Sequence, residues 1–281
     1  MIEAKIIADS RSESGVRLTT FQLVYPRFIH AEFMTHRVFS RNASSSRAIP
    51  VAKMIEQVRT NPAMPVHWGQ NQPGMQANAE IQHVGAAKDQ WVRAAKEAAD
   101  IAEEMTKIGL HKQVANRILE PFQWIHVVVT ATEWDNFFVL RAHKDAQPEI
   151  QELAVKMKKA MDDSTPRLLR MDEWHLPYVL PSEIAGVKEI ISSNLRLSCM
   201  SELIKVSAAR CARVSYLKHD GSAPNLMEDL ALYDRLVGSE PIHASPIEHQ
   251  ARPMPVEHRD AFFGNFRGWM QYRKQFESAM A

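Results

Sequence analysis

The chain has 281 residues and 45% hydrophobic content, so it can bury a sizeable core as one large domain or two small ones. Its 34 Lys and Arg residues nearly balance its 33 Asp and Glu residues, for a formal net charge of +1. This balance provides no overall basic field to attract nucleic acid or a membrane surface, so any basic site must be local.

Two segments predict β-strands. In residues 16–28, Phe21, Leu23 and Tyr25 recur at a period of two, which places them on one side of an extended chain. Residues 124–134 form a β-branched run that follows Pro121 and ends in polar residues.

Helical periodicity is strongest over residues 86–108, and Gly109 is placed to end this helix. The expected apolar stripe of the helix consists of Trp91, Ala95, Ala98, Ile101 and Met105. Further helices are predicted at 111–119, 145–162, 199–213 and 225–237.

This mixture of strands and helices predicts an α+β fold, with a mixed sheet flanked by helices. Two stretches rich in turn residues, 61–78 and 174–186, read as excursions from regular structure. The second could separate lobes at 1–175 and 188–281 within one domain that spans 1–281.

Residues 34–50, MTHRVFSRNASSSRAIP, gather many hydrogen-bond donors directly after an apolar segment. Hydroxyls and backbone amides at Ser45 and Ser46 with the guanidinium of Arg47 suit a phosphate, and His36 and Arg37 lie just upstream. The alternative interpretation of the string alone is a solvated Ser/Arg loop.

Other segments favour the first interpretation, because together they resemble the flavin-dependent thymidylate synthases. The signature of that family is Arg-His-Arg, seven residues, Ser, and an Arg two positions on; here it reads Thr35-His36-Arg37, seven residues, Ser45 and Arg47. The segment that leads into it is similar to the strand and helix that precede the signature in the family. Four further segments of this chain resemble conserved blocks of the family. They are ANRILEPF at 115–122, DNFFVLRAHKDAQPEIQ at 135–151, AARCARVSYLKHDG at 208–221 and HASPIEHQ at 243–250.

The last two blocks come first in most family members, so the order here is rotated and implies a circular permutation. Such a change is tolerated when the old termini lie close together at the surface. Residues 262–276 also resemble the helix before the signature, with Arg267–Arg273 parallel to Ala31–Arg37. A duplicated helix is one explanation, and an unrelated amphipathic helix is the other.

The resemblance implies methylation of dUMP to dTMP with FAD, with NADPH as reductant and methylenetetrahydrofolate as carbon donor, without a cysteine nucleophile. Arg141 and Ser45 correspond to catalytic positions, and Arg141 would hold the uracil carbonyl. The implied dUMP-binding residues are Glu32, Ser45, Ser46, Arg47, Arg117 and Arg141. The implied FAD-binding residues are His36, Arg37, Asn42, Asn136, Ser215, His243, Ser245 and Glu248.

Several positions depart from the family pattern. Thr35 replaces the first signature Arg, for which Arg273 or Arg41 could substitute, and Glu32 stands where a Gln usually lies near the phosphate. Thr130 and Thr132 occupy positions where Asn and Arg meet the flavin, and Asp145 occupies a usual His position. FAD affinity or the second substrate could therefore differ.

The two cysteines, Cys199 and Cys211, lack metal-site spacing and are expected to be free thiols in a reducing cytoplasm. His243 and His249 are six residues apart, which does not match the helical zinc pattern, so no metal is expected. The start of the chain lacks a signal-peptide pattern, and no apolar run approaches the roughly 20 residues of a membrane span. We expect a cytoplasmic location.

Two alternatives to methylation remain at this stage. One is a sibling flavin- and folate-dependent reaction in which water captures the methylene group, which gives a hydroxymethyl nucleotide. The other is a non-catalytic nucleotide- or RNA-binding descendant of the fold, which Thr35 and Thr132 favour. By resemblance, we also expect a homotetramer with active sites between subunits, with dUMP and folate as ligands and no nucleic-acid or membrane partner.

Overall fold

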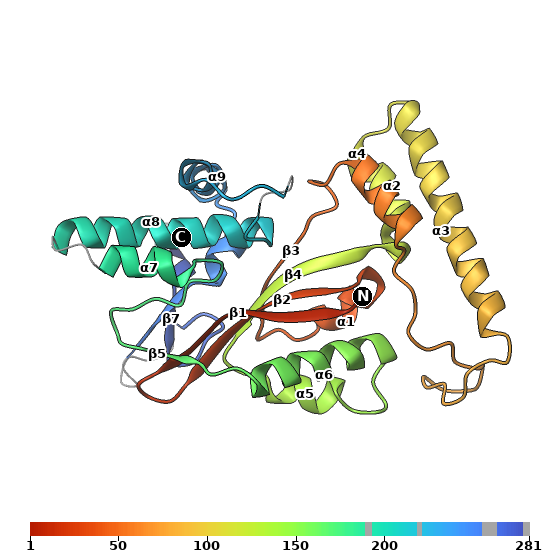
Figure 1. Ribbon diagram of the computed structural model, residues 1–281, viewed down its shortest axis with the longest axis horizontal. Helices are drawn as coiled ribbons and strands as arrows, with labels where there is room; N and C mark the ends of the chain where they lie inside the picture. The colour runs from red at the N-terminus through yellow and green to blue at the C-terminus, as the bar shows by residue number, and fades with distance from the viewer. Residues whose placement is uncertain (189–192, 218–220, 255–262, 278–281) are drawn as a thin grey trace.

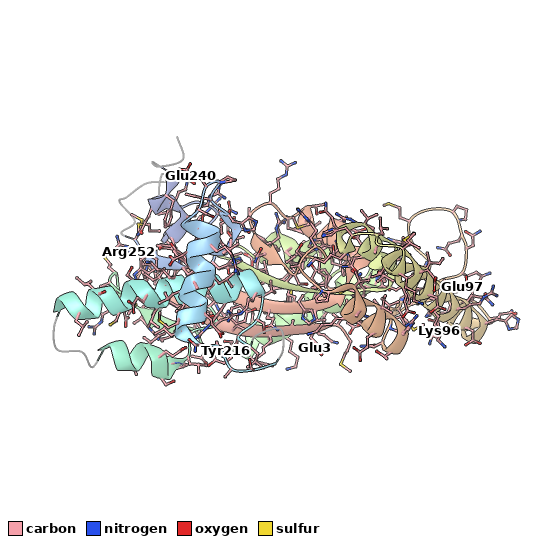
Figure 2. The ribbon with its side chains drawn as sticks, turned by 90° about the horizontal axis from the view of Figure 1, so that it is seen from above. Glu3, Lys96, Glu97, Tyr216, Glu240 and Arg252 are labelled. Atoms are coloured by element: carbon pink, nitrogen blue, oxygen red, sulfur yellow. The ribbon has the colours of Figure 1, made fainter. Side chains whose placement is uncertain are left out.

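A computed structural model of the protein describes residues 1–188, 193–217, 221–254 and 263–277. The fold is α+β, as predicted, and is elongated: Lys96 and Glu97 on the long helix α3 lie toward one end, and Glu240 and Arg252 toward the other (Figures 1 and 2). Within the described ranges, no helix is long and apolar enough to cross a bilayer.

The central sheet is mixed and has the strand order β3-β4-β2-β1-β5. β5 runs parallel to β1, and the other neighbours are antiparallel. The strands are β1 (Glu3–Ser12), β2 (Arg17–Pro26), β3 (Ser40–Ala43), β4 (Trp124–Ala131) and β5 (Arg167–Leu169). A separate antiparallel pair consists of β6 (Ala251–Pro253) and β7 (Trp269–Gln271).

The helices lie around this sheet. In the first part of the chain these are α1 (His30–Met34), α2 (Val51–Thr60), α3 (Val84–Lys107), α4 (Lys112–Ala115), α5 (Asp135–Arg141) and α6 (Pro148–Asp162). Then follow α7 (Pro181–Lys188), α8 (Ser193–Arg213) and α9 (Leu226–Val237). Short 3-10 helices are η1 (Arg27–Ile29), η2 (Asn116–Phe122), η3 (Ser245–Glu248) and η4 (Tyr272–Gln275). Figure 1 shows α5 and α6 on one side of the sheet, and α7, α8 and α9 on the other side, toward the end of the molecule opposite α3.

The strand patterns of the sequence explain the core. Phe21, Leu23 and Tyr25 of β2 are fully buried in one cluster with Leu153 and Met157 of α6, as their period-two spacing predicts. β4 is buried on both faces, because Val127 and Val129 belong to that cluster while Val128 packs with Cys211 and Val214. A strand covered on both faces needs apolar side chains at successive positions, which accounts for its β-branched run.

The predicted helix at 86–108 is confirmed as α3, and Gly109 follows it with φ +87°. Its expected stripe is only partly right. Ile101 is 51% exposed, and the buried face is instead Ala95, Ala99 and Ala102. These small side chains pack in one cluster with Val58 and other residues of α2, because alanine lets two helices approach closely.

The predicted tail helix at 262–276 is wrong for its described part. Residues 263–268 form turns, and Trp269–Gln271 forms β7, which pairs with β6 before η4 begins. The spacing of arginines and aromatics suggested a helix, but pairing with β6 fixes an extended chain. Two smaller differences also appear: α7 lies partly inside the predicted excursion 174–186, and the helix expected at 111–119 is the short α4 followed by η2.

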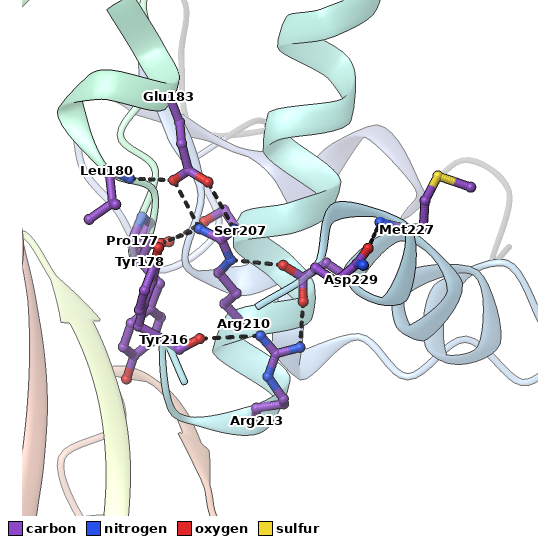
Figure 3. A network of polar contacts seen from close by, with 11 residues as sticks. Pro177, Tyr178, Leu180, Glu183, Ser207, Arg210, Arg213, Tyr216, Met227 and Asp229 are labelled. Atoms are coloured by element: carbon purple, nitrogen blue, oxygen red, sulfur yellow. Dashed lines mark hydrogen bonds and ion pairs between the residues drawn. The ribbon is translucent and has the colours of Figure 1, made fainter. Parts of the chain in front are cut away.

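At the end of the molecule opposite α3, a buried ion-pair network around α8 holds the helices together (Figure 3). Arg210 donates to Asp229 Oδ2 at 2.9 Å and to both carboxylate oxygens of Glu183 at 2.9 and 3.0 Å. Arg213 contacts Asp229 Oδ1 at 2.5 Å. The network joins α7, α8 and α9 into one unit, and the last turn of α8 leads to Val214 at φ 57°.

Candidate active site

A hydrogen bond between His36 and Arg141 joins two segments that are far apart in the sequence. α1 ends at Met34, so Thr35 and His36 follow it directly, and Arg141 is the last residue of α5. Arg141 Nε donates to His36 Nε2 at 3.0 Å, and Arg141 Nη2 donates to Thr35 Oγ1 at 3.3 Å. Two of the predicted site residues are therefore in direct contact.

The environment of His36 keeps its imidazole neutral. Burial, then the charges of Arg141 and Arg41, lower the pKa of His36 below its ordinary value of 6.5. A neutral ring can accept through Nε2, which the bond from Arg141 requires, and then carries its proton on Nδ1. Arg41 donates to the backbone carbonyls of Met34 and His36 at 3.0 and 2.8 Å, which fixes the turn after α1.

Each partner of this bond lines a different cavity. Arg141 lines a cavity of about 820 Å³, together with the segment 144–149 and residues of the loop between α2 and α3. His36 lines a second cavity of about 750 Å³, which also has Asn136 in its wall. Both volumes fall in the range of small-molecule sites, roughly 300–1,000 Å³.

The second cavity combines aromatic, polar and charged lining residues. The rings of Phe39, Trp134 and Phe138 provide apolar walls, while His36 and Asn136 add polar groups. His36 is itself held among rings, with its centroid 4.9 Å from that of Phe137. The rings of Phe39 and Trp134 are almost fully buried, and the charged residues Arg17, Glu133, Asp135, Lys158 and Asp162 complete the lining.

The predicted phosphate-binding residues form a separate cluster after β3. Backbone N–H of Arg47 donates to Ser45 Oγ at 3.2 Å, and Asn116 Nδ2 donates to the carbonyl of buried Ser46 at 2.7 Å. Asn116 thereby brings the neighbouring Arg117 close to this loop. Arg117 donates to Glu120 at 2.8 Å but remains half exposed, and Arg47 is exposed.

A third group joins β3 to the last part of the chain. Asn42 Nδ2 donates to the carbonyl of Cys211 at 2.8 Å, and Ser245 Oγ donates to Asn42 Oδ1 at 3.2 Å. Glu248 pairs with Arg273. Burial raises the pKa of Glu248, against the opposing charges of Arg273 and then Arg41. The HASPIEHQ block thus lies against β3, which carries Asn42 of the signature.

The remaining predicted residues lie outside these contacts. Arg37 and His243 are exposed, and Ser215 is half-buried just after Val214. Glu32 has one carboxylate oxygen, Oε2, buried without a hydrogen-bond partner among the described residues. Its backbone carbonyl accepts from Thr35 Oγ1 at 2.7 Å, so Glu32 lies near the Arg141 contact.

The positions that depart from the family pattern have definite partners. Thr130 is fully buried and bonds Thr20 at 2.7 Å and His249 at 2.9 Å, so it belongs to the interior. Thr132 lines the second cavity and accepts from the backbone N–H of Arg267. Arg273, considered as a substitute for the missing Arg at Thr35, is paired with Glu248.

Residues of the loop 61–78 were missed as site residues. His67, Gln76 and Asn78 line the cavity of Arg141, and Trp91 adds an aromatic wall from α3. The only sequence signal was the polar, turn-rich composition of the loop, which does not indicate what the loop covers.

The fold and these contacts define an α+β protein with two ligand-sized cavities, one lined by His36 and the other by Arg141, its hydrogen-bond partner. The family model described as thymidylate synthase complementing protein matches residues 16–167, more than half of the chain. The chain belongs to this family, which confirms the resemblance to the flavin-dependent thymidylate synthases. The circular permutation stays a prediction.

Among solved structures, the chain is similar to the UMP/dUMP methylase PolB from Streptomyces cacaoi in two crystal structures. The structure bound with 5-Br dUMP has a TM-score of 0.50 and 16% identity, and covers 57% of this chain and 90% of that one. The structure bound with 5-Br UMP has a TM-score of 0.50 and 17% identity, with 57% and 89% covered. At this identity the likeness establishes the fold. No curated protein sequence matches this chain.

Proposed function

We propose that this protein methylates dUMP to dTMP, with methylenetetrahydrofolate as carbon donor, NADPH as reductant and FAD as cofactor. The observation that carries the proposal is the His36–Arg141 bond, with one ligand-sized cavity beside each partner. A nucleotide base near Arg141 and a flavin near His36 would then be neighbours. Family membership supports the same reaction class.

Arg141 is proposed to activate the pyrimidine. Uracil is a weak carbon nucleophile, and a guanidinium on its carbonyl favours the anionic form of the ring. The bond to neutral His36 orients Arg141, while its Nη1 has no partner among the described residues and is free to bind substrate. Neither cysteine lines the two cavities, and burial raises the pKa of Cys211, which supports a mechanism without a cysteine nucleophile.

His36 and Asn136 are the residues proposed to hold the isoalloxazine ring, and Asn42, Ser245 and Glu248 are proposed to contact the rest of FAD. When bound, the flavin supplies the two electrons that separate a methylene from a methyl group. Arg37, Ser215 and His243 are proposed as further FAD contacts at the protein surface.

The phosphate is proposed to bind at Ser45, Ser46, Arg47 and Arg117. None of these residues lines the Arg141 cavity, and an exposed Arg47 lacks an ion-pair partner among the described residues. In the proposed assembly, a nucleotide contacts Arg141 of one copy of the chain and Arg47 of another. We propose a homotetramer with shared active sites, in which Glu32 lies near the nucleotide.

We also propose that residues 1–281 form one circularly permuted domain. The supporting observation is the hydrogen bond between Asn42 of β3 and Ser245, which are 203 residues apart in the sequence. The two family blocks thus meet in space despite their rotated order.

The test is a spectrum followed by a product mass. The purified protein is expected to take up FAD and, under anaerobic conditions with dUMP, NADPH and methylenetetrahydrofolate, to release a nucleotide one methyl group heavier. UMP is tested in parallel, because the similar crystal structures are of a UMP/dUMP methylase.

The alternatives give different results in the same assay. A product heavier by a hydroxymethyl group identifies the sibling reaction. A protein that takes up no flavin and returns dUMP unchanged is a non-catalytic binding descendant, and overturns the proposal.

A further inference from the structure

The loop between α2 and α3 is anchored at both of its sides. Trp91 Nε1 of α3 donates to the carbonyl of Ala63 at 2.9 Å. The backbone N–H of Val66 donates to Glu149 Oε1 at 2.8 Å, and Glu149 is only 3% exposed at the start of α6. In Figure 1 the loop runs beside α3 toward the connection between α5 and α6.

The loop also has its own internal structure. Gly69 and Glu80 form an antiparallel bridge, with Gln70 N–H donating to Ala79 at 2.7 Å and Ile81 N–H to Trp68 at 2.9 Å. A side chain at Gly69 would meet the Cβ of Ala77 at 2.2 Å, so the two sides of the loop are in close contact. These contacts hold the backbone of the loop in place beside the cavity.

This loop presents two side-chain amides to the cavity of Arg141. Gln76 and Asn78 are exposed residues that line the cavity, and neither side-chain amide has a hydrogen-bond partner within the described part of the chain. Each amide offers a donor and an acceptor side by side. Uracil presents the matching pair at its N3–H and adjacent carbonyls, while Trp91 and Phe28 supply aromatic surface in the same cavity.

We propose that Gln76 and Asn78 are substrate-binding residues that hydrogen-bond the pyrimidine ring beside Arg141, and that the loop 65–78 is the specificity wall of this site. This inference rests on the proposed function, because it takes the pyrimidine nucleotide as the ligand of the Arg141 cavity. It extends the site to a segment that the sequence resemblance leaves out.

The experiment measures dUMP affinity of the FAD-loaded protein by isothermal titration calorimetry. Asn78→Ala and Gln76→Ala are each expected to weaken binding roughly tenfold, since one lost hydrogen bond is worth about that factor. Asn71→Ala is the matched control, because Asn71 is an exposed loop residue of the same chemistry outside the cavity. Gly69→Ala, which forces the wall to shift, is expected to weaken dUMP binding as well.

Flavin absorbance and circular dichroism of each variant establish that the fold and the FAD site are intact. If Asn78→Ala and Gln76→Ala bind dUMP as tightly as Asn71→Ala, the inference is overturned while the proposed function stands. If the unaltered protein takes up FAD but binds no dUMP, the proposed function fails, and the inference fails with it.

Discussion

A neutral imidazole is required at His36, because Arg141 cannot donate to a ring that carries protons on both nitrogens. The lowered pKa of His36 meets this requirement at neutral pH, and the guanidinium that benefits from it is one cause of the shift. Burial and then the charge of Arg141 keep the histidine neutral, and the neutral histidine in turn orients the arginine.

Replacement of Arg141 by Lys is expected to lower kcat by about 100-fold or more, with a smaller change in the dissociation constant of dUMP. A point charge cannot bond His36, Thr35 and a carbonyl in one plane as a guanidinium does. Steady-state kinetics with separate dUMP titration measures both quantities. Arg93→Lys, at an exposed pair on α3, is the control. An unchanged kcat for Arg141→Lys would show that Arg141 has no part in the chemical step.

At the scale of elements, a buried series of hydrogen-bonded side chains connects the sheet to the segments before α7 and β6. Ser10 bonds His175 at 2.8 Å, His175 bonds Thr20 at 2.7 Å, and Thr20 continues through Thr130 to His249. Burial is the main cause that lowers the pKa of both histidines to about 3.

These buried histidines predict that the free energy of unfolding decreases in acid. The unfolded histidines titrate near 6.5 and the folded ones near 3, so the unfolded state binds more protons between these values. The stabilisation is complete above pH 6.5 and falls with decreasing pH, by at most about 1.4 kcal/mol per histidine per pH unit. Urea unfolding at pH 7, 6 and 5 measures it. His249→Gln should make the free energy of unfolding depend less steeply on pH. An equal pH dependence in both proteins would exclude His249 as its source.

The network around α8 predicts that loss of the Asp229 carboxylate strongly lowers the free energy of unfolding. Asp229 is fully buried and faces Arg210, which is 2% exposed, and Arg213 (Figure 3). Asp229→Ala leaves these charges without that partner and is expected to cost about 3–5 kcal/mol of unfolding free energy. Thermal and urea unfolding measure the cost, with Arg93→Ala on the surface as the control. A midpoint as high as that of the control would contradict a structural role for the network.

The sequence predicts elements where the local pattern decides the structure, as in β2 and β4, whose alternating or continuous apolar residues match one or two buried faces. It does not predict which face of α3 is buried, because contact with α2 selects the alanines over Ile101. It is wrong for residues 269–271, where pairing with β6 overrides the helical spacing. In each such case the deciding partner is distant in the sequence.

At the scale of the whole molecule, the resemblance names site residues but not their grouping. His36 meets Arg141, and Asn42 meets Ser245, while Ser45, Ser46 and Arg47 lie at the other end of β3 from His36. The strand between them separates the two groups. Sequence alone could not reveal this division, since it depends on how β3 pairs with β4.

The proposed sharing of active sites between subunits predicts complementation between two inactive variants. Arg141→Ala removes the proposed base contact, and Arg47→Ala removes the proposed phosphate contact. Co-expressed, they are expected to recover roughly a quarter of the normal activity, because one in four random subunit pairs supplies both intact groups in a symmetric oligomer. The measurement is dTMP formation by hetero-oligomers purified through two different tags. Each variant alone, confirmed as an oligomer by light scattering, is the control. Hetero-oligomers with no more activity than the separate variants would place Arg141 and Arg47 in the active site of a single chain. A fully active monomer would contradict the proposed oligomer itself.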